Sequence, residues 1–167
     1  LDPSADSAYY LGLLNDKRGN EPEALKFYEE SIKLGTDPYK KAKILYKIAL
    51  KFKNAGRKSS ARNYANKALF YQPSLGRAYL LIASLYASSA NDCGNNQFEK
   101  RAVYWLAANV AQKAGRVDAS IRKLANSTRA SYLGRAPSKT DIFTEGKEGA
   151  SIKFNCWING SVKVPKL

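Results

Sequence analysis

The sequence contains no histidine, no methionine and only two cysteines. Without histidine the chain cannot form a Ser-His-Asp triad or a histidine metal site, and it lacks the commonest general base. Cys93 and Cys156 lie more than 60 residues apart, which does not match the paired spacing of a zinc site. Its glycines match neither a phosphate-binding loop nor a dinucleotide-binding loop. We therefore expect a non-catalytic protein with no metal and no cofactor.

Long apolar runs are absent as well. No stretch approaches the roughly 18 apolar residues of a membrane-spanning helix, so we expect a chain that is not transmembrane. The N-terminus has neither the charged region nor the apolar region of a targeting signal. Because the chain begins with Leu1 and has no methionine, we interpret it as a fragment or a processed product. Residues 1–3 are typical of the closing turn of a repeat, which predicts further repeats upstream.

Acidic residues are absent from residues 38–91. The whole chain has a net charge of +14. The basic residues in that stretch are Lys40, Lys41, Lys43, Lys47, Lys51, Lys53, Arg57, Lys58, Arg62, Lys67 and Arg77. A field of one sign attracts anionic partners, which include acidic protein surfaces, phospholipids and nucleic acids. The alternative is that these side chains form a solvated basic helix face without a partner.

Large and small apolar residues recur at fixed positions over residues 42–75. They are Leu45, Ile48, Ala49, Phe52, Ala61, Ala65 and Pro73. From Ala49 to Ala83 is 34 residues, and from Gly12 to Ala49 is 37 residues. This pattern resembles the tetratricopeptide repeat, whose period is about 34 residues. The resemblance implies antiparallel helix pairs that stack into a solenoid, because one pair cannot bury its own apolar faces.

We expect three helix pairs followed by a capping helix. The expected helices span residues 5–18 and 22–34, then 38–54 and 58–71, then a helix from about 75 and a helix over 98–114, with the capping helix over 118–133. Asp37 is the expected N-cap of the helix that begins at Pro38. Residues 91–96 lengthen the turn inside the third pair by about seven residues relative to the repeat.

The apolar period changes from 3.6 residues to 2 near the C-terminus. Ile152, Phe154, Cys156 and Ile158 alternate with other residues, and Asn159-Gly160 is the strongest signal of a two-residue hairpin turn. A lone hairpin is marginally stable in water, so this one must pack on the helices. We therefore expect an all-α tetratricopeptide-like solenoid over residues 1–133, a linker over 134–150, and a small C-terminal β-hairpin over 151–167.

The resemblance also places a binding surface. In tetratricopeptide proteins, fixed positions of each first helix line the concave groove. The corresponding residues here include Asp6 and Asp16, and those that we predict to bind a partner are Tyr9, Tyr10, Leu13, Lys43, Tyr46, Lys47, Leu50, Arg77 and Leu80. Aromatic and aliphatic side chains beside lysine and arginine suit a peptide or protein segment with acidic groups. The alternative is that several of these side chains pack between neighbouring helices.

A finer resemblance comes from three segments that occur in order. They are residues 98–107, 137–143 and 154–159. Together they resemble the C-terminal end of large tetratricopeptide proteins that Bacteroidota export to the cell envelope. This resemblance implies a periplasmic location and an interaction scaffold, without implying any reaction.

The leading functional hypothesis is therefore a protein-interaction scaffold of the bacterial envelope that binds an acidic peptide or protein segment. The alternative is an anion-binding module that uses the basic region 40–77 on nucleic acid or anionic lipid. Nucleic acid is the less favoured partner, because the chain contains no dedicated nucleic-acid motif. Salt separates the two hypotheses, since binding to nucleic acid weakens steeply as the salt concentration rises.

The two cysteines leave two interpretations open. Cys93 lies in the lengthened turn and Cys156 lies on the first expected strand, and the linker is long enough for the hairpin to fold back. In an oxidising compartment a disulfide would close a loop of about 60 residues, with a stabilisation on the order of 4 kcal/mol. The other interpretation is an unlinked pair, with Cys156 buried as a small apolar residue.

Overall fold

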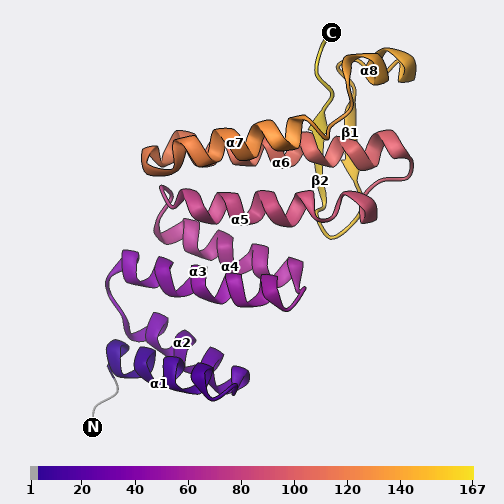
Figure 1. The fold of residues 1–167 in the computed structure, drawn as a ribbon. Coiled ribbons are helices and arrows are strands. Elements are labelled where there is room, and N and C mark those ends of the chain that lie inside the picture. Colours follow the sequence, from indigo (N-terminus) through magenta and orange to yellow (C-terminus); the bar gives the residue numbers. More distant parts are fainter. Residues whose placement is uncertain (1–3) are drawn as a thin grey trace.

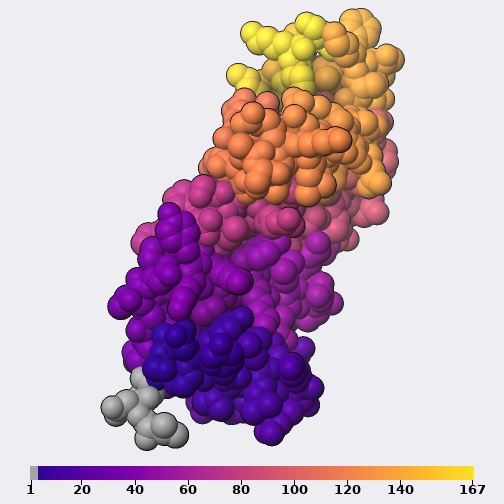
Figure 2. Space-filling view, turned by 60° about the vertical axis from the view of Figure 1, so that its left-hand side comes forward, coloured from indigo at the N-terminus to yellow at the C-terminus, as the bar shows by residue number. Residues whose placement is uncertain are grey.

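The computed structural model describes residues 4–167, so the closing turn expected at residues 1–3 lies outside the described part. The helices stack in layers along an elongated body, with α1 and the hairpin at opposite ends (Figures 1 and 2). The helices are α1 (Ala5–Lys17), α2 (Glu21–Leu34), α3 (Pro38–Asn54), α4 (Lys58–Tyr71), α5 (Gly76–Ala87), η1 (Ala90–Asp92), α6 (Gln97–Val117), η2 (Ala119–Ile121), α7 (Arg122–Leu133) and α8 (Lys139–Glu145). The strands are β1 (Ser151–Phe154) and β2 (Gly160–Lys163).

The expected helix pairs are present. α1 packs on α2, α3 on α4 and α5 on α6, and α7 covers α6 as the capping helix. Small residues allow the close approach of α3 and α4, because Ala49, Ala61 and Ala65 are fully buried between them. The structure thus confirms the repeat fold of three helix pairs and a capping helix with a small hairpin.

Local chemistry explains where the helices begin and end. Asp37 caps α3 as expected, because its carboxylate accepts hydrogen bonds from the backbone N–H groups of Tyr39 and Lys40. Gly19 and Gly56 occupy the turns inside the first two pairs with φ of 73° and 72°. This left-handed backbone suits glycine, which has no Cβ to clash with the following carbonyl.

Residues 134–150, expected as a linker, contain the seven-residue helix α8. Its N-terminus has a capping box, in which Ser138 and Asp141 bond to each other's backbone N–H groups. Arg101 of α6 fixes this segment, since it forms an ion pair with Asp141 at 3.0 Å and donates to the carbonyl oxygen of Ala136 at 2.8 Å. So short a helix carries little periodic signal, which is why the sequence did not predict it.

The C-terminal hairpin differs from its prediction in the turn. β1 pairs with β2 in antiparallel register, with Ile152 opposite Val162 and Phe154 opposite Gly160. The expected two-residue Asn159-Gly160 turn is therefore wrong, because Gly160 already belongs to β2. The connection instead spans residues 155–159, and within it Ile158 is 2% exposed. Burial of this loop against the helices outweighs the local turn preference.

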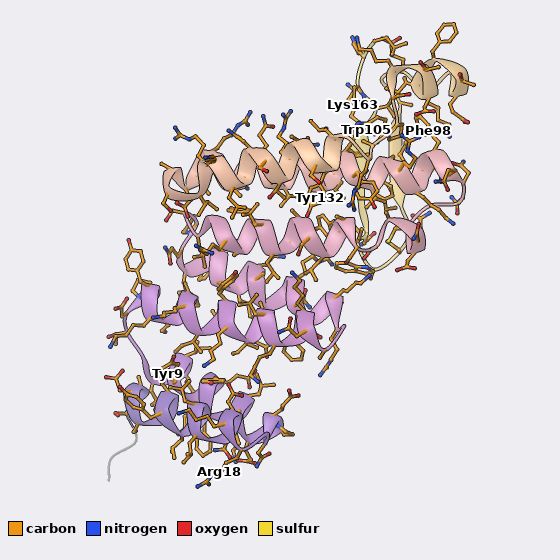
Figure 3. All side chains as sticks on the ribbon, in the orientation of Figure 1. Tyr9, Arg18, Phe98, Trp105, Tyr132 and Lys163 are labelled. Atoms are coloured by element: carbon orange, nitrogen blue, oxygen red, sulfur yellow. A yellow bond between two sulfur atoms is a disulfide. The ribbon has the colours of Figure 1, made fainter. Side chains whose placement is uncertain are left out.

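The largest apolar cluster joins the hairpin to α6. Phe154 and Val164 of the hairpin segment pack with Val103 and Trp105 of α6, and all four are buried. Figure 3 shows Phe98 and Trp105 on the part of α6 that lies beside the strands. In residues 4–167, no helix combines the length and the apolar character that crossing a membrane requires.

Candidate partner-binding surface

The nine residues predicted to bind a partner lie on the first helix of each pair. Tyr9, Tyr10 and Leu13 are on α1, Lys43, Tyr46, Lys47 and Leu50 are on α3, and Arg77 and Leu80 are on α5. The structure divides eight of them into three groups, and the ninth, Arg77, is exposed. Some line an open pocket, one belongs to a charged cluster, and others pack between helices.

The open pocket lies where α1 meets the start of α3. It has a volume of about 420 Å³, and we call it the α1–α3 pocket. Its walls are formed by Ala5, Asp6, Tyr9, Tyr10, Ser31, Leu34, Gly35, Thr36, Asp37, Lys40, Lys41, Lys43 and Ile44. Tyr10 is 68% exposed at its edge, whereas Tyr9 is half-buried between α1 and α3 (Figure 3). The pocket therefore brings together three predicted residues, Tyr9, Tyr10 and Lys43.

Part of this pocket was missed by the sequence prediction. Leu34 at the end of α2 and the turn 35–37 between α2 and α3 line one wall of the pocket. A signal for this wall was present, because the spacing from Gly12 to Ala49 exceeds the spacing from Ala49 to Ala83 by three residues. The longer turn sits where the first two pairs meet, and this is the place where the pocket opens.

A charged cluster on the same face centres on Asp16 of α1. Its carboxylate oxygens lie 3.9 Å from Lys47 Nζ and 2.7 Å from Lys51 Nζ, and the Tyr28 hydroxyl donates to it at 2.6 Å. Burial and the bond to Asp16 raise the pKa of Tyr28 far above its usual range. Burial lowers the pKa of Lys47, while Asp16 opposes that shift. This cluster joins α1 to α3 across the interface between the first two pairs.

The groove is consequently less positive than the sequence suggested. Lys47 and Lys51 are engaged by Asp16, and Lys40 lies 3.4 Å from Asp6. Within residues 4–167, Lys43 and Arg77 form no ion pair. These two exposed side chains are the predicted groove cations that remain open to an acidic partner.

Four of the predicted residues pack against buried clusters. Leu13 contacts the cluster that contains Tyr28, Tyr46 and Leu50 pack against the cluster of α3, α4 and α5, and Leu80 packs against α6 and α7. Burial raises the pKa of Tyr46, although the nearby Arg77 opposes the shift. These side chains contribute to both the helix packing and the edge of the groove, because each is half-buried.

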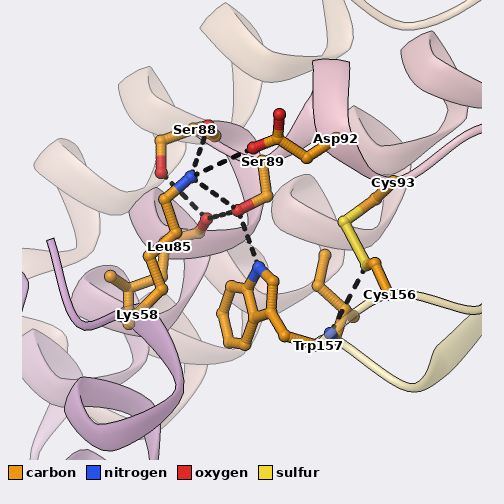
Figure 4. Close-up of polar contacts among 9 residues, drawn as sticks. Lys58, Leu85, Ser88, Ser89, Asp92, Cys93, Cys156 and Trp157 are labelled. Carbon is orange, nitrogen blue, oxygen red and sulfur yellow. Dashed lines mark hydrogen bonds and ion pairs between the residues drawn. A yellow bond between two sulfur atoms is a disulfide. The ribbon is translucent and has the colours of Figure 1, made fainter.

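The two cysteines, whose pairing the sequence left open, form a disulfide in the structure. Cys93 and Cys156 lie 5.3 Å apart at their Cα atoms and tie the hairpin loop to the turn between α5 and α6 (Figure 4). Beside the disulfide, Trp157 Nε1 donates to the buried hydroxyl of Ser89 at 3.0 Å. Lys58 of α4 donates to the same hydroxyl at 3.0 Å. The hairpin loop therefore contacts the connection between α5 and α6 at two points, and Ser89 joins this contact to α4 through Lys58.

No cluster of potential metal ligands occurs among residues 4–167. No protein-family model matches the chain. The described geometry offers a pocket and charged side chains, which are features of a binding surface.

Several curated proteins with detectable similarity carry the name photosystem I assembly protein Ycf3. The protein from Cuscuta gronovii is 29% identical over 121 residues, which cover 67% of this chain and 72% of that protein. The protein from Cuscuta obtusiflora is 31% identical over 110 residues, covering 60% of this chain and 66% of the relative. The protein from Cyanophora paradoxa is 32% identical over 110 residues, covering 60% and 64%. These similarities support a tetratricopeptide-like repeat protein.

The same comparisons correct the predicted location. The sequence resemblance to exported Bacteroidota proteins implied a periplasmic protein, and this prediction is wrong. The similar proteins are photosystem I assembly proteins of Cuscuta and Cyanophora, and not exported proteins of a bacterial envelope. The error arose because the envelope assignment relied on short segments near the C-terminus. These segments resembled sequence fragments of the exported proteins and not a functional site.

Proposed function

We propose that this chain is a non-catalytic interaction module that takes part in assembling a protein complex. The observation that carries this proposal is the α1–α3 pocket, where exposed aromatic and basic side chains surround an open volume of about 420 Å³. Apolar pockets flanked by a few polar groups are the common form of a site that anchors a partner's side chain. The relatives are named as assembly proteins, which supports the same class of role here.

The proposed ligand is a segment of a partner protein with one apolar side chain and nearby acidic groups. The apolar side chain would enter between Tyr9, Tyr10 and Ile44, which lie on two different helix pairs. An acidic group beside it would meet Lys43, whose ammonium is exposed and forms no ion pair within residues 4–167. Charge complementarity of this kind mainly raises the association rate and the specificity of binding.

Crosslinking in the cells that make the protein tests this proposal. A photoreactive amino acid at position 10 should crosslink to defined subunits of a complex, identified by mass spectrometry. The double variant Tyr10→Ala/Lys43→Glu should lose copurification of the same subunits by at least 10-fold. The matched control is Phe143→Ala/Lys123→Glu, because those side chains are also exposed but lie on α8 and α7.

Equal loss of copurification in both double variants would contradict the proposal, as would full retention in Tyr10→Ala/Lys43→Glu. Lys47 is left unchanged in this design. Its ammonium belongs to the Asp16 cluster, so its reversal would disturb the packing of α1 on α3 as well as the partner surface.

An anion-binding role remains the alternative, since no acidic residue occurs in residues 38–91. Within the chain, however, Lys40, Lys47 and Lys51 are engaged by carboxylates of α1, which reduces the charge available to phosphates. Titration with an oligonucleotide from about 50 mM to 200 mM salt separates the two roles. A loss of affinity of about 10³-fold or more would favour the nucleic-acid role.

A further inference from the structure

A second surface lies between α2 and α4, and we call it the outer cleft. It has a volume of about 580 Å³ and continues along α4 into a shallow hollow of about 570 Å³. The outer cleft is lined by Glu29, Ile32, Lys33, Lys41, Leu45, Tyr64, Lys67, Phe70 and Tyr71. Apart from Lys41, these residues do not line the α1–α3 pocket.

An exposed aromatic side chain stands at the junction of the two hollows. Phe70 is 80% exposed, the highest value among the large apolar side chains of residues 4–167. Its ring contacts the edge of the Tyr71 ring, with centroids 5.2 Å apart, and it belongs to none of the buried clusters. The packing of the solenoid therefore does not account for a phenylalanine at this position.

Three lysines from three different helices line the outer cleft together with this aromatic side chain. Lys33 is on α2, Lys41 on α3 and Lys67 on α4. None of them forms an ion pair with a carboxylate of residues 4–167. Two lie over aromatic rings, with Lys41 Nζ 5.2 Å from the centre of Tyr71 and Lys67 Nζ 4.8 Å from that of Tyr64.

The single carboxylate in the lining is already engaged. Glu29 accepts a hydrogen bond from the Tyr64 hydroxyl at 2.5 Å. The Tyr64 ring in turn stacks on Phe52, with an interplanar angle of 18°. The aromatic wall of the cleft is thus fixed in place. The lysine ammonium groups of the cleft form no ion pair with a carboxylate of the described chain.

We propose that the outer cleft binds an acidic segment of a partner protein, with an aromatic side chain of that segment packed on Phe70. Carboxylates on either side of the aromatic residue would pair with Lys33, Lys41 and Lys67. A protein segment fits better than a nucleic acid, because the three lysines share the cleft with apolar and aromatic side chains that suit an apolar group of a peptide. Apart from the shared Lys41, this surface is distinct from the α1–α3 pocket, and under the proposed function it would give the chain a second contact with the complex that is assembled.

The test uses the full chain and a labelled peptide of about 12 residues, acidic throughout except for one central phenylalanine. Fluorescence anisotropy measures its affinity at low salt. The variant Lys33→Glu/Lys41→Glu/Lys67→Glu should bind at least 10-fold more weakly. The variant Lys123→Glu/Lys163→Glu/Lys166→Glu has the same net charge and should stay within about twofold of the natural chain. Absence of binding to the natural chain, or equal losses in the two variants, would overturn the proposal.

The aromatic contact has its own test. Phe70→Ala should weaken binding of the phenylalanine peptide by roughly 2- to 10-fold, the range expected for an aromatic pair. It should leave unchanged the affinity of a matched peptide with alanine in place of phenylalanine. Equal effects on the two peptides would show that no aromatic side chain of the peptide packs on Phe70, and would overturn this part.

Two further measurements distinguish the outer cleft from a competing site and from competing ligands. The variant Tyr10→Ala/Lys43→Glu should bind the peptide normally, whereas loss of binding only in that variant would overturn the outer cleft and leave the α1–α3 pocket standing. A single-stranded oligonucleotide and vesicles with anionic phospholipid serve as competitors. Tighter binding of either one through Lys33, Lys41 and Lys67 would replace the protein segment as the ligand.

Discussion

The two ends of this solenoid are joined to its centre by different forces. The first helix pair meets the second through a small apolar cluster around Tyr28 and Ile48 and through polar contacts, in which Asp16 binds Lys47 and Lys51 and Glu29 binds Tyr64. Cavities also line that interface on several sides. The C-terminal end instead has a broad apolar cluster and the Cys93–Cys156 disulfide. Polar, partly exposed contacts are weakened by salt, whereas apolar burial and covalent links are not.

The contrast indicates which end can adapt to a partner. Both proposed binding surfaces, the α1–α3 pocket and the outer cleft, lie where the first pair meets the second. A loosely packed interface can change shape at small cost in free energy when a ligand enters it. The C-terminal end, which carries neither proposed surface, is suited to holding the stack together.

The largest expected effect comes from removing the disulfide. The bond spans 63 residues of sequence, for which the chain-entropy model gives a stabilisation of about 4 kcal/mol. Cys93→Ala/Cys156→Ala should therefore lower the free energy of unfolding by about that amount in urea titrations followed by circular dichroism. Reducing agent should reproduce the loss in the natural chain and have no effect on the variant. A loss below about 1 kcal/mol would show that the apolar cluster alone holds this end.

A smaller loss is expected from Gly12→Ala in α1. A Cβ at this position would lie 2.6 Å from ring carbons of Tyr28, which is fully buried and bonded to Asp16. Overpacking of this kind lowers the free energy of unfolding by about 1–3 kcal/mol. The destabilisation should affect the first helix pair and leave the other pairs unchanged. Gly134→Ala is the control, because its Cβ would meet atoms no closer than 3.6 Å. Equal melting temperatures for both variants would contradict the tight fit of Tyr28 against α1.

Asp16→Asn tests the polar contact between the first two pairs. The substitution removes the partner of Lys47 and Lys51, and we expect a loss of about 1 kcal/mol, reduced because the two lysines are about one third exposed. The loss should shrink at high salt, where the natural ion pairs are screened. Asp6→Asn breaks the exposed pair with Lys40 and should change the free energy of unfolding by less than about 0.5 kcal/mol. A similar loss of unfolding free energy in Asp16→Asn and Asp6→Asn would show that Asp16 stabilises the chain no more than an exposed ion pair does.

Tyr64→Phe should have an effect similar in size to that of Asp16→Asn, but one that depends on pH. Burial and the bond to Glu29 raise the pKa of Tyr64 from 10.0 to about 12. Because the folded-state pKa is the higher one, the stabilisation is fully present below pH 10.0 and is lost as the pH rises through about 12. The natural chain should exceed the variant by about 1 kcal/mol at pH 8, and the two should converge at alkaline pH. A difference independent of pH would contradict the assignment.

The repeat fold could be predicted because its signal is spread over many positions. Ala49, Ala61 and Ala65 each report the close approach of helices, and the register of one pair constrains the next. The hairpin turn could not be predicted in the same way. Local preference favoured Asn159-Gly160, whereas burial of Ile158 and the bond from Cys156 to Cys93 shifted the turn to residues 155–159. Contacts between residues far apart in sequence decided that segment.

The candidate site could be predicted only in part. Register placed Tyr9, Tyr10 and Lys43 on one face, and the structure brings them to one pocket. Register did not reveal that Asp16 engages Lys47, since this contact depends on how α1 and α3 are offset in space. The outer cleft was not predicted, because its lysines belong to three helices and only the packing of α2, α3 and α4 brings them together.

Native-state hydrogen exchange tests the difference between the two ends most directly. Amides of α1 and α2 should exchange with a lower opening free energy than those of α6 and β1, and added salt should lower only the value for α1 and α2. Both effects follow from a first pair held by a small apolar cluster and by salt-sensitive polar contacts, and from a C-terminal end held by a larger apolar cluster and a disulfide. A single opening free energy shared by α1, α2, α6 and β1 at every salt concentration would contradict this account.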